Sequence, residues 1–100
     1  MLKNFRSYRL AVDFHHSVHA AKLPGYLRDQ ILRASSSVAL NLAEGSARPT
    51  FRDKQKFYFI ALSSLRECQA ALDLAPTEYS ELVKSADELG ACLYRLCHPK

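Results

Sequence analysis

The sequence has few of the residues that interrupt regular structure. Only three glycines and four prolines occur among its 100 residues. So few breaks imply a small number of long elements, and elements of that length are helices. Apolar residues make up 48% of the chain and charged residues 24%, which excludes an intrinsically disordered composition and indicates a folded globular domain.

Long apolar runs are also missing. The longest uncharged run, residues 34–43, has ten residues, against roughly 20 for a membrane helix. The first ten residues, MLKNFRSYRL, contain Lys and Arg and lack the apolar segment of a secretory signal. Cys68, Cys92 and Cys97 are odd in number and form no C-x-x-C pair, which is typical of reduced thiols. We therefore expect a cytoplasmic protein that does not contact a membrane.

Catalytic and cofactor-binding motifs are lacking as well. The glycines are isolated, so no glycine-rich phosphate loop is present, and no G-x-S-x-G turn occurs. His15 and His19 are four residues apart, which places two imidazoles on one helix face. The sequence supplies no third ligand beside them. We expect no enzyme activity, no cofactor and no metal site.

Breaks at residues 23–25, 45–50 and 76–77 divide the chain into four segments with helical apolar spacing. We expect one domain, residues 1–100, with helices at about 3–22, 26–44, 51–75 and 78–97, and with Thr50 and Thr77 as N-caps. Because short connections favour antiparallel neighbours, the expected fold is all-α, an antiparallel up-down-up-down four-helix bundle. The predicted core stripes are Leu27, Ile31, Ala34, Val38 and Leu42, then Phe57, Ala61, Leu65, Cys68 and Leu72, then Leu82, Ala86, Leu89, Leu93 and Leu96.

Two of the expected helices carry more apolar residues than one buried face requires. A bundle buries about one face of each helix, so the surplus either stays exposed as scattered side chains or is covered by another molecule. We favour self-association through the first and third helices. The expected interface residues are Leu10, Phe14, Val18, Tyr58, Phe59 and Leu62.

Polar residues follow one edge of the second helix at spacings of four and three, within roughly 80° of one another. A second polar row flanks the core stripe of the third helix. We expect the rows to meet between these helices and to fix their register. The alternative is a ligand or nucleic-acid site at the following loop. Gly45 is expected to end the second helix with a positive φ. The residues concerned are Arg33, Ser37, Asn41, Glu44, Gly45 and Arg48, with Ser64 and Glu67 in the second row.

The same stretch carries a resemblance to a known family. The segment SVALNLAEG, residues 37–45, followed by Arg48, resembles the S-I-P-x-N-I-A-E-G…R signature of bacterial proteins encoded in 23S rRNA intervening sequences. Gln30, Arg33 and Ala34 resemble the preceding Q-I-R-R-A stretch, and IALSSLRE, residues 60–67, is similar to I-A-x-G-S-L-x-E-L. Ala39 stands where the family usually has proline, so any helix kink there should be weaker.

The resemblance implies a four-helix bundle that assembles as a homopentamer. Relatives also include the accessory variability proteins of diversity-generating retroelements, which are basic, bind nucleic acid and act with a reverse transcriptase. A reverse transcriptase is therefore the protein partner that the resemblance implies. The resemblance to the members encoded in rRNA insertions implies no particular biochemical function.

Positive charge is concentrated in the first two thirds of the chain. Residues 1–66 hold eleven Lys/Arg against four Asp/Glu, and residues 67–100 hold three against six. Basic residues alternate with aromatic ones at the starts of the first and third helices, which an up-down bundle brings to one end. Cations contact phosphates and aromatic rings stack on unpaired bases, so this end suits RNA. The candidate contacts are Lys3, Arg6, Arg9, Arg48, Arg52, Lys54 and Lys56.

The sequence thus predicts a non-catalytic homo-oligomer that binds nucleic acid, specifically RNA. In the alternative interpretation, the excess Lys and Arg residues are solvated surface side chains interspersed with acidic ones, and they bind no nucleic acid. The protein would then be an oligomeric scaffold or adaptor whose protein partner docks on apolar and acidic surfaces of the third and fourth helices.

Overall fold

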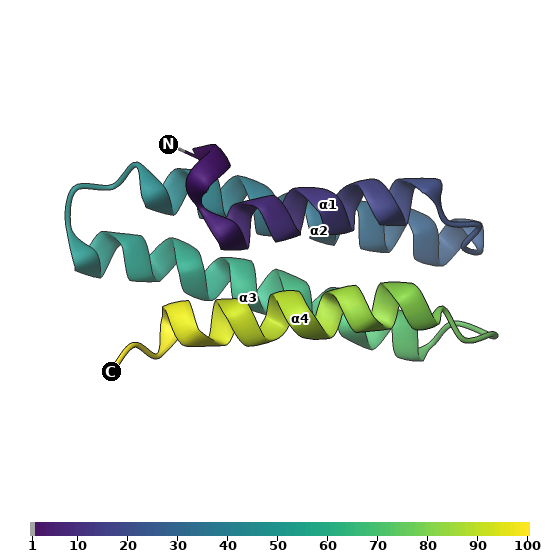
Figure 1. The fold of residues 1–100 in the computed structure, drawn as a ribbon. Helices are drawn as coiled ribbons and strands as arrows, with labels where there is room; N and C mark the ends of the chain where they lie inside the picture. Colours follow the sequence, from purple (N-terminus) through teal and green to yellow (C-terminus); the bar gives the residue numbers. More distant parts are fainter. Residues whose placement is uncertain (1) are drawn as a thin grey trace.

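The structure, a computed structural model, describes residues 2–100, and within this range the fold consists of four long helices and one short one. A 3₁₀ turn, Leu2–Asn4, precedes α1 (Arg6–Ala20), α2 (Gly25–Ser46), α3 (Phe51–Asp73) and α4 (Ser80–Cys97). Successive helices run in opposite directions and are joined by short connections (Figure 1). The predicted up-down-up-down four-helix bundle is confirmed. None of the helices in residues 2–100 has the length and apolar composition that a membrane span requires.

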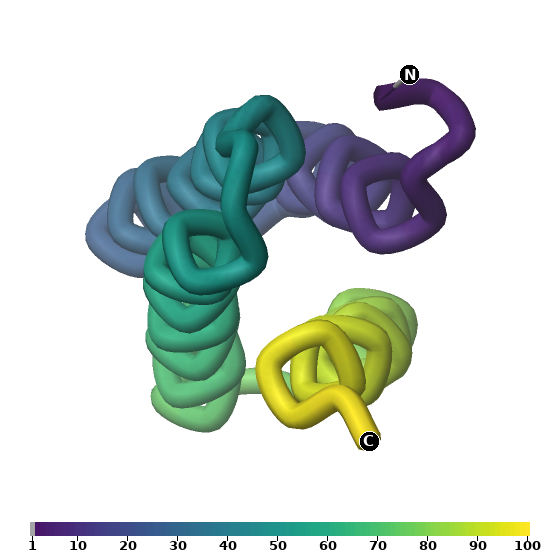
Figure 2. Tube along the Cα trace, turned by 90° about the vertical axis from the view of Figure 1, so that its left-hand side faces the viewer, coloured from purple at the N-terminus to yellow at the C-terminus, as the bar shows by residue number. Residues whose placement is uncertain are grey.

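In cross-section the helices lie at the corners of a square (Figure 2). Each helix packs against two neighbours, α1 and α3 both lying against α2 and α4. The body measures 42 × 23 × 19 Å. The contact between α2 and α3 is the most extensive of the four, and that between α1 and α4 is the least extensive. The α2–α3 hairpin is therefore the main structural unit of the bundle.

The predicted apolar stripes form most of the core. All five stripe residues of α2 are buried, and so are four of the five in α4, where Leu96 is partly buried. The stripe of α3 begins one residue later than expected, because Tyr58 is buried and Phe57 is only partly so. Helical spacing alone could not decide which of these two adjacent aromatic residues is buried, because Ala61 lies within about one turn of both.

Three residues predicted for an oligomer interface belong to the core of the single chain. Phe14 and Val18 are 1% and 0% exposed, and Tyr58 is 9% exposed. The interface prediction is wrong for these three, because the face of α1 that carries Phe14 and Val18 is the face that packs into the bundle. The remaining three lie nearer the surface, Phe59 exposed and Leu10 and Leu62 partly buried.

The helix ends follow local capping chemistry. The Thr50 hydroxyl accepts a hydrogen bond from the backbone N–H of Asp53 at 3.2 Å, so the predicted N-cap of α3 is confirmed. Thr77 does not cap α4, which begins at Ser80. The Tyr79 hydroxyl instead donates to the backbone carbonyl of Lys22 at 2.8 Å. This bond fixes the start of α4 against the connection between α1 and α2.

Gly45 has a packing role in place of the predicted turn. No residue in the described range has a positive φ, and Gly45 lies buried within α2. A Cβ at this position would stand 2.8 Å from Cε1 of Tyr58 and 3.0 Å from Cβ of Phe57. The prediction of a left-handed Gly45 is therefore wrong. The missing side chain lets the end of α2 approach the start of α3.

Replacing Gly45 with Ala should lower the free energy of unfolding by about 1–3 kcal/mol, as overpacking in a well-filled interior does. The Cβ of Phe57 is fixed to the backbone of α3, so a rotamer change cannot relieve the clash. Gly25→Ala is the matched control, since nothing lies within 4 Å of a Cβ there. It should be neutral or stabilising by up to about 1 kcal/mol. Urea denaturation measures both, and equal losses for the two variants would contradict this packing role.

Candidate nucleic-acid interface

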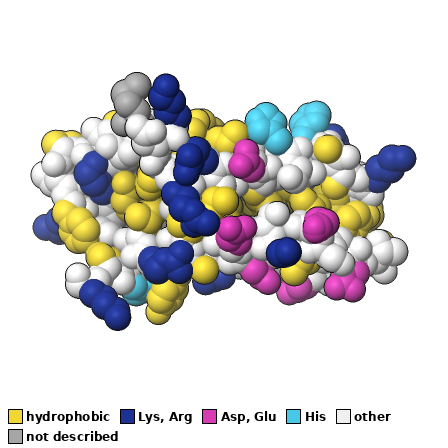
Figure 3. All heavy atoms as spheres, viewed as in Figure 1, with side chains coloured by type: hydrophobic (Ala, Val, Ile, Leu, Met, Phe, Trp, Pro, Cys, Tyr) yellow, Lys and Arg dark blue, Asp and Glu magenta, His cyan; other side chains and the backbone are white. Residues whose placement is uncertain are grey.

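The start of α1, the end of α4 and the α2–α3 connection lie at the same end of the bundle (Figure 1). In the space-filling view, Lys and Arg side chains gather over this end, whereas Asp and Glu lie over the middle and the other half (Figure 3). The cations predicted to contact nucleic acid sit on the first turns of α1 and α3, on the preceding 3₁₀ turn, and just after α2. We call this surface the basic end, and it comprises Lys3, Arg6, Arg9, Arg48, Arg52, Lys54 and Lys56.

Two arginines of the basic end form ion pairs within the protein. Nη2 of Arg6 lies 3.2 Å from Oε2 of Glu88 and links α1 to α4. Nη2 of Arg48 lies 2.6 Å from Oε2 of Glu44, and the Arg48 guanidinium covers the Phe57 ring at 4.8 Å from its centroid. All four ion-paired side chains are about half exposed. Exposed pairs of this kind contribute little, roughly 0–1 kcal/mol, so a phosphate can compete for either arginine.

Lys54 is the least available cation of the basic end. Its ammonium donates to the backbone carbonyl of Ser46 at 2.9 Å and is only partly exposed. This bond satisfies one of the carbonyls that the last turn of α2 leaves without a helical partner. Lys54 therefore acts mainly as a cap for α2.

The remaining four cations are exposed. Lys3, Arg9, Arg52 and Lys56 make no ion pair with any residue from 2 to 100. They lie on three separate segments that the fold brings to one end. Four charges without acidic partners produce a positive potential that favours an anionic ligand.

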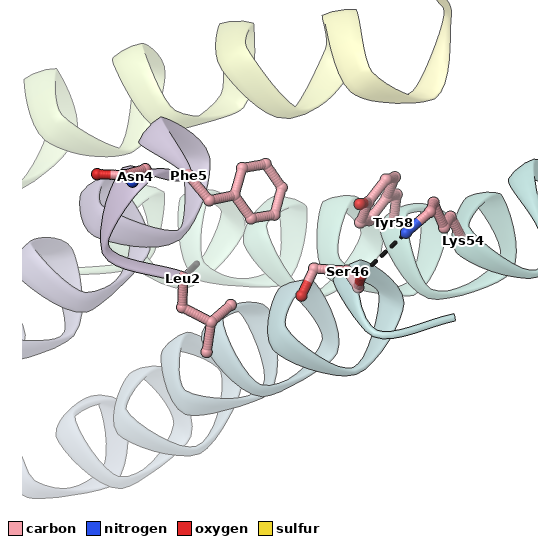
Figure 4. Close-up of a pocket in the computed structure, with 6 residues that line it drawn as sticks. All are labelled: Leu2, Asn4, Phe5, Ser46, Lys54 and Tyr58. Atoms are coloured by element: carbon pink, nitrogen blue, oxygen red, sulfur yellow. Dashed lines mark hydrogen bonds between the residues drawn. The ribbon is translucent and has the colours of Figure 1, made fainter. Parts of the chain in front are cut away.

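A cavity of about 500 Å³ opens at the basic end (Figure 4). The Phe5 and Tyr58 rings approach each other across it, with centroids 6.0 Å apart and planes at 54°. Burial raises the pKa of the Tyr58 hydroxyl above its ordinary value of 10.0, so this group is uncharged at neutral pH. The rings of Phe5 and Tyr58 therefore form an uncharged, largely apolar wall of the cavity beside the Lys54 ammonium. Its lining residues are Leu2, Asn4, Phe5, Ser46, Lys54 and Tyr58.

The end of α4 also belongs to this region, which the sequence did not indicate. The Gln55 amide of α3 donates to the backbone carbonyl of Leu96 at 2.9 Å, so the start of α3 and the end of α4 lie side by side. Arg95 and Lys100, both exposed, therefore add to the positive charge. The net negative charge of residues 67–100 did not suggest these two cations, because the acidic residues of α4 lie closer to the opposite end of the bundle. The antiparallel topology, which brings the end of α4 beside the start of α3, could have indicated them.

The two polar rows meet between α2 and α3. The hydroxyls of Ser37 and Ser64 are 2.9 Å apart. The Asn41 amide donates to the backbone carbonyl of Ser37 at 2.8 Å and to its hydroxyl at 3.1 Å. Farther along, the Gln30 amide donates to the Glu67 carboxylate. These side-chain contacts run along one edge of the α2–α3 contact and join the two helices in a fixed register.

Four residues predicted for this polar row take no part in it. Glu44 and Arg48 are exposed and pair with each other, Arg33 is exposed, and Gly45 packs against Tyr58. Including them in the row is therefore wrong. Arg48 lies past the end of α2, and the exposed side chains of Arg33 and Glu44 lie outside the buried contact with α3. Gly45 does lie against α3 but has no side chain that could form a hydrogen bond there.

His15 has a structural contact of its own. Nδ1 of His15 and the Ser35 hydroxyl are hydrogen-bonded at 2.6 Å, and the same hydroxyl lies 3.2 Å from the backbone carbonyl of Leu32. Burial, followed by repulsion from His16 and His19, lowers the pKa of His15 below 6.5. The neutral ring thus joins α1 to α2. Among residues 2–100 there is no group of three or more His, Cys, Asp or Glu side chains able to hold a metal ion.

The contact between Ser37 and Ser64 should make a measurable contribution to stability. Each single change to Ala should lower the free energy of unfolding by about 1 kcal/mol, the usual value for one hydrogen bond. The double variant should lose about 0.5–1 kcal/mol less than the sum of the single losses, because the second change removes a bond that is already broken. Denaturant unfolding of the four proteins measures this coupling. Strictly additive losses would mean that the two hydroxyls act independently.

The family model described as 23S rRNA-intervening sequence protein matches residues 3–95, which include α1, α2, α3, most of α4 and the seven cations of the basic end. No curated protein matches the chain. The family match spans nearly the whole chain and includes the residues on which the sequence resemblance depends. The chain therefore belongs to the 23S rRNA-intervening sequence protein family.

Proposed function

We propose that this protein is a non-catalytic homo-oligomer that binds RNA through its basic end. The observation that carries the proposal is the convergence, at one end of the bundle, of four exposed cations that form no ion pair with any described residue. They are Lys3, Arg9, Arg52 and Lys56. Arg6, Arg48 and Arg95 are exposed beside them and extend the same surface.

The chemistry would be neutralisation of phosphates. Lysine and arginine bind phosphate oxygens and release condensed counterions, so binding weakens steeply as salt rises. Contacts of this kind position a nucleic acid without reading its sequence. For four phosphate contacts, affinity should fall about 50- to 150-fold between about 50 and 200 mM salt.

Binding without catalysis is part of the proposal, and the state of the thiols supports it. Burial, and to a lesser extent the nearby Glu67 charge, raises the pKa of Cys68 to about 12. Burial also raises the pKa of Cys97 above its ordinary value. Thiols held in the protonated form are poor nucleophiles. All three cysteines are free and buried, as suits a protein of the reducing cytoplasm.

Self-association is supported by the outer face of the α2–α3 hairpin. Tyr26 and Leu74 lie together at one end of this face, where they line a common hollow and are each 72% exposed. Leu40 and Ile60 are 68% and 47% exposed and follow at a spacing of fourteen residues along each helix. This spacing keeps both pairs on the same side of the hairpin. A homopentamer, as the family resemblance implies, would cover this face.

The exposed apolar face of the hairpin also favours a second candidate function. An oligomeric scaffold could bind a protein partner there, such as the reverse transcriptase implied by the resemblance, without binding nucleic acid. The two functions differ in one respect that is simple to test. Only the first depends on the cations of the basic end.

Reversing Arg52 and Lys56 to Glu should abolish RNA binding, because it replaces two phosphate contacts with two repulsions. Lys54 is left unchanged since it caps α2. Fluorescence anisotropy of labelled RNA measures affinity, and we expect a loss of at least a hundredfold at low salt. The matched control reverses two exposed cations distant from this end, Lys22 and Lys84, and changes net charge equally. It should lose far less affinity.

Two results would contradict the RNA-binding proposal. One is a wild-type protein that binds no RNA even at low salt, which would leave the scaffold function as the better candidate. The other is an equal loss in the two reversed variants, which would mean that net charge, and not the basic end, determines binding.

Changing Leu40 and Ile60 to Arg should dissociate the proposed oligomer, because two charges would enter an apolar interface. Light scattering after gel filtration should give several times the chain mass of 11.3 kDa for the wild type and a single chain for the variant. Both residues are exposed, so circular dichroism should show an intact fold. Ala91→Arg, at an exposed position on α4, is the control and should keep the wild-type mass. A variant mass equal to the wild type would place the interface elsewhere.

A further inference from the structure

Three aromatic rings form an exposed cluster beside the basic end. Phe59 of α3 is 47% exposed and Tyr94 of α4 is 52% exposed. His98, just past the end of α4, lies between them. Its ring stacks on Tyr94, with centroids 4.1 Å apart and planes at 25°, and meets Phe59 edge-on at 5.6 Å and 81°. The core does not use this cluster, which we call the ring platform.

The rings are held in place by more than their mutual contact. The backbone carbonyl of Tyr94 accepts from the backbone N–H of His98 at 2.9 Å. The same carbonyl accepts from Nδ1 of His98 at 3.1 Å. Two bonds to one oxygen fix the imidazole over the tyrosine ring. A fixed surface loses less conformational entropy on binding than a mobile one.

Cations flank the ring platform on both helices. On α3, Lys56 and Arg52 precede Phe59 by three and seven residues, a spacing that places all three on one helix face. On α4, Arg95 directly follows Tyr94. All three cations are exposed, and within the part of the chain that the structure describes none of them pairs with a carboxylate. Positive charge beside open aromatic faces complements a phosphate backbone that carries bases.

We infer that the ring platform is a stacking site for the unpaired bases of single-stranded RNA. This inference rests on the proposed RNA binding and names the form of RNA that the basic end prefers. Aromatic side chains stack on bases whose faces are free, whereas the bases of a duplex cover one another. The cations alone do not discriminate between the two forms. The ring platform supplies the preference for single strands.

The spacing along α3 indicates the length of RNA that one chain engages. Seven helical residues separate Arg52 from Phe59, which is about 10 Å along the axis at 1.5 Å per residue. A stacked strand advances about 3.4 Å per nucleotide, so this distance covers about three nucleotides. One chain therefore fits a short unpaired segment, with a base on the ring platform and phosphates beside Lys56 and Arg52.

The test compares a short unstructured RNA with a blunt RNA duplex of the same length. Changing Phe59 and Tyr94 together to Leu keeps apolar volume and charge but removes the aromatic faces. Affinity for the single strand should fall about tenfold or more, while affinity for the duplex should change less than about twofold. Tyr94→Phe keeps a ring and should retain single-strand affinity. His19→Leu removes an exposed aromatic ring of α1 that lies outside both the basic end and the outer face of the α2–α3 hairpin, and it should leave both affinities unchanged.

A spectroscopic measurement distinguishes stacking from a structural effect. A fluorescent adenine analogue in the single strand is quenched when it stacks on an aromatic ring. The protein contains no tryptophan, so its own emission interferes little. We expect quenching with the wild type and with Tyr94→Phe, and a loss of quenching with the Leu double variant at saturating protein.

The failure of this inference differs from the failure of RNA binding itself. If the wild type binds single strands and the Leu double variant binds and quenches them equally well, the ring platform has no role and RNA binding by the basic end stands. If the double variant instead loses oligomer mass without losing single-strand affinity, the rings contact a second copy of the chain and the inference is wrong. If the wild type binds neither RNA, both proposals fail together.

Discussion

The close approach of α2 to α3 at Gly45 is the constraint on which the rest of the structure depends. Tyr58 fills the space that a side chain at position 45 would occupy, and this contact closes the hairpin at the end that carries Arg48 and Arg52. Ser37 and Ser64 then fix the register along the edge of the same contact. The hairpin provides the surface against which α1 and α4 pack, one on each of its helices.

The arrangement of charge follows from this topology. Because the helices alternate in direction, the start of α1, the α2–α3 connection and the end of α4 meet at one end, and each contributes cations there. The opposite half carries much of the acidic charge. A chain with a net charge of only +4 thereby gathers nine of its 14 Lys and Arg residues at one end. The outer face of the hairpin is more apolar, so the regions suited to an anionic ligand and to a protein partner lie apart.

Helical periodicity and the chain breaks were sufficient to predict the fold, since the stripes of α2 and α4 are buried almost as expected. Periodicity could not determine which helical face turns inward where a helix is apolar on more than one side. Phe14 and Val18 were therefore assigned to an interface although the core holds them. The role of Gly45 also escaped prediction, because a glycine near a break suggests a turn and only the packing shows the nearby Tyr58. For the candidate site, the sequence was sufficient to place the cations of α1 and α3 at one end of the bundle. It could not bring Tyr94 and His98 to that end, because they become neighbours of Phe59 only in the folded chain.

The central claim is that the basic end is the RNA-binding surface of this family member. Photo-cross-linking of the wild-type protein to RNA, followed by mass spectrometry of the linked peptides, tests it most directly. The account predicts cross-links within residues 2–9, 48–59 and 94–100. Cross-links concentrated on the outer face of the α2–α3 hairpin, or at the end formed by residues 20–28 and 73–82, would contradict it.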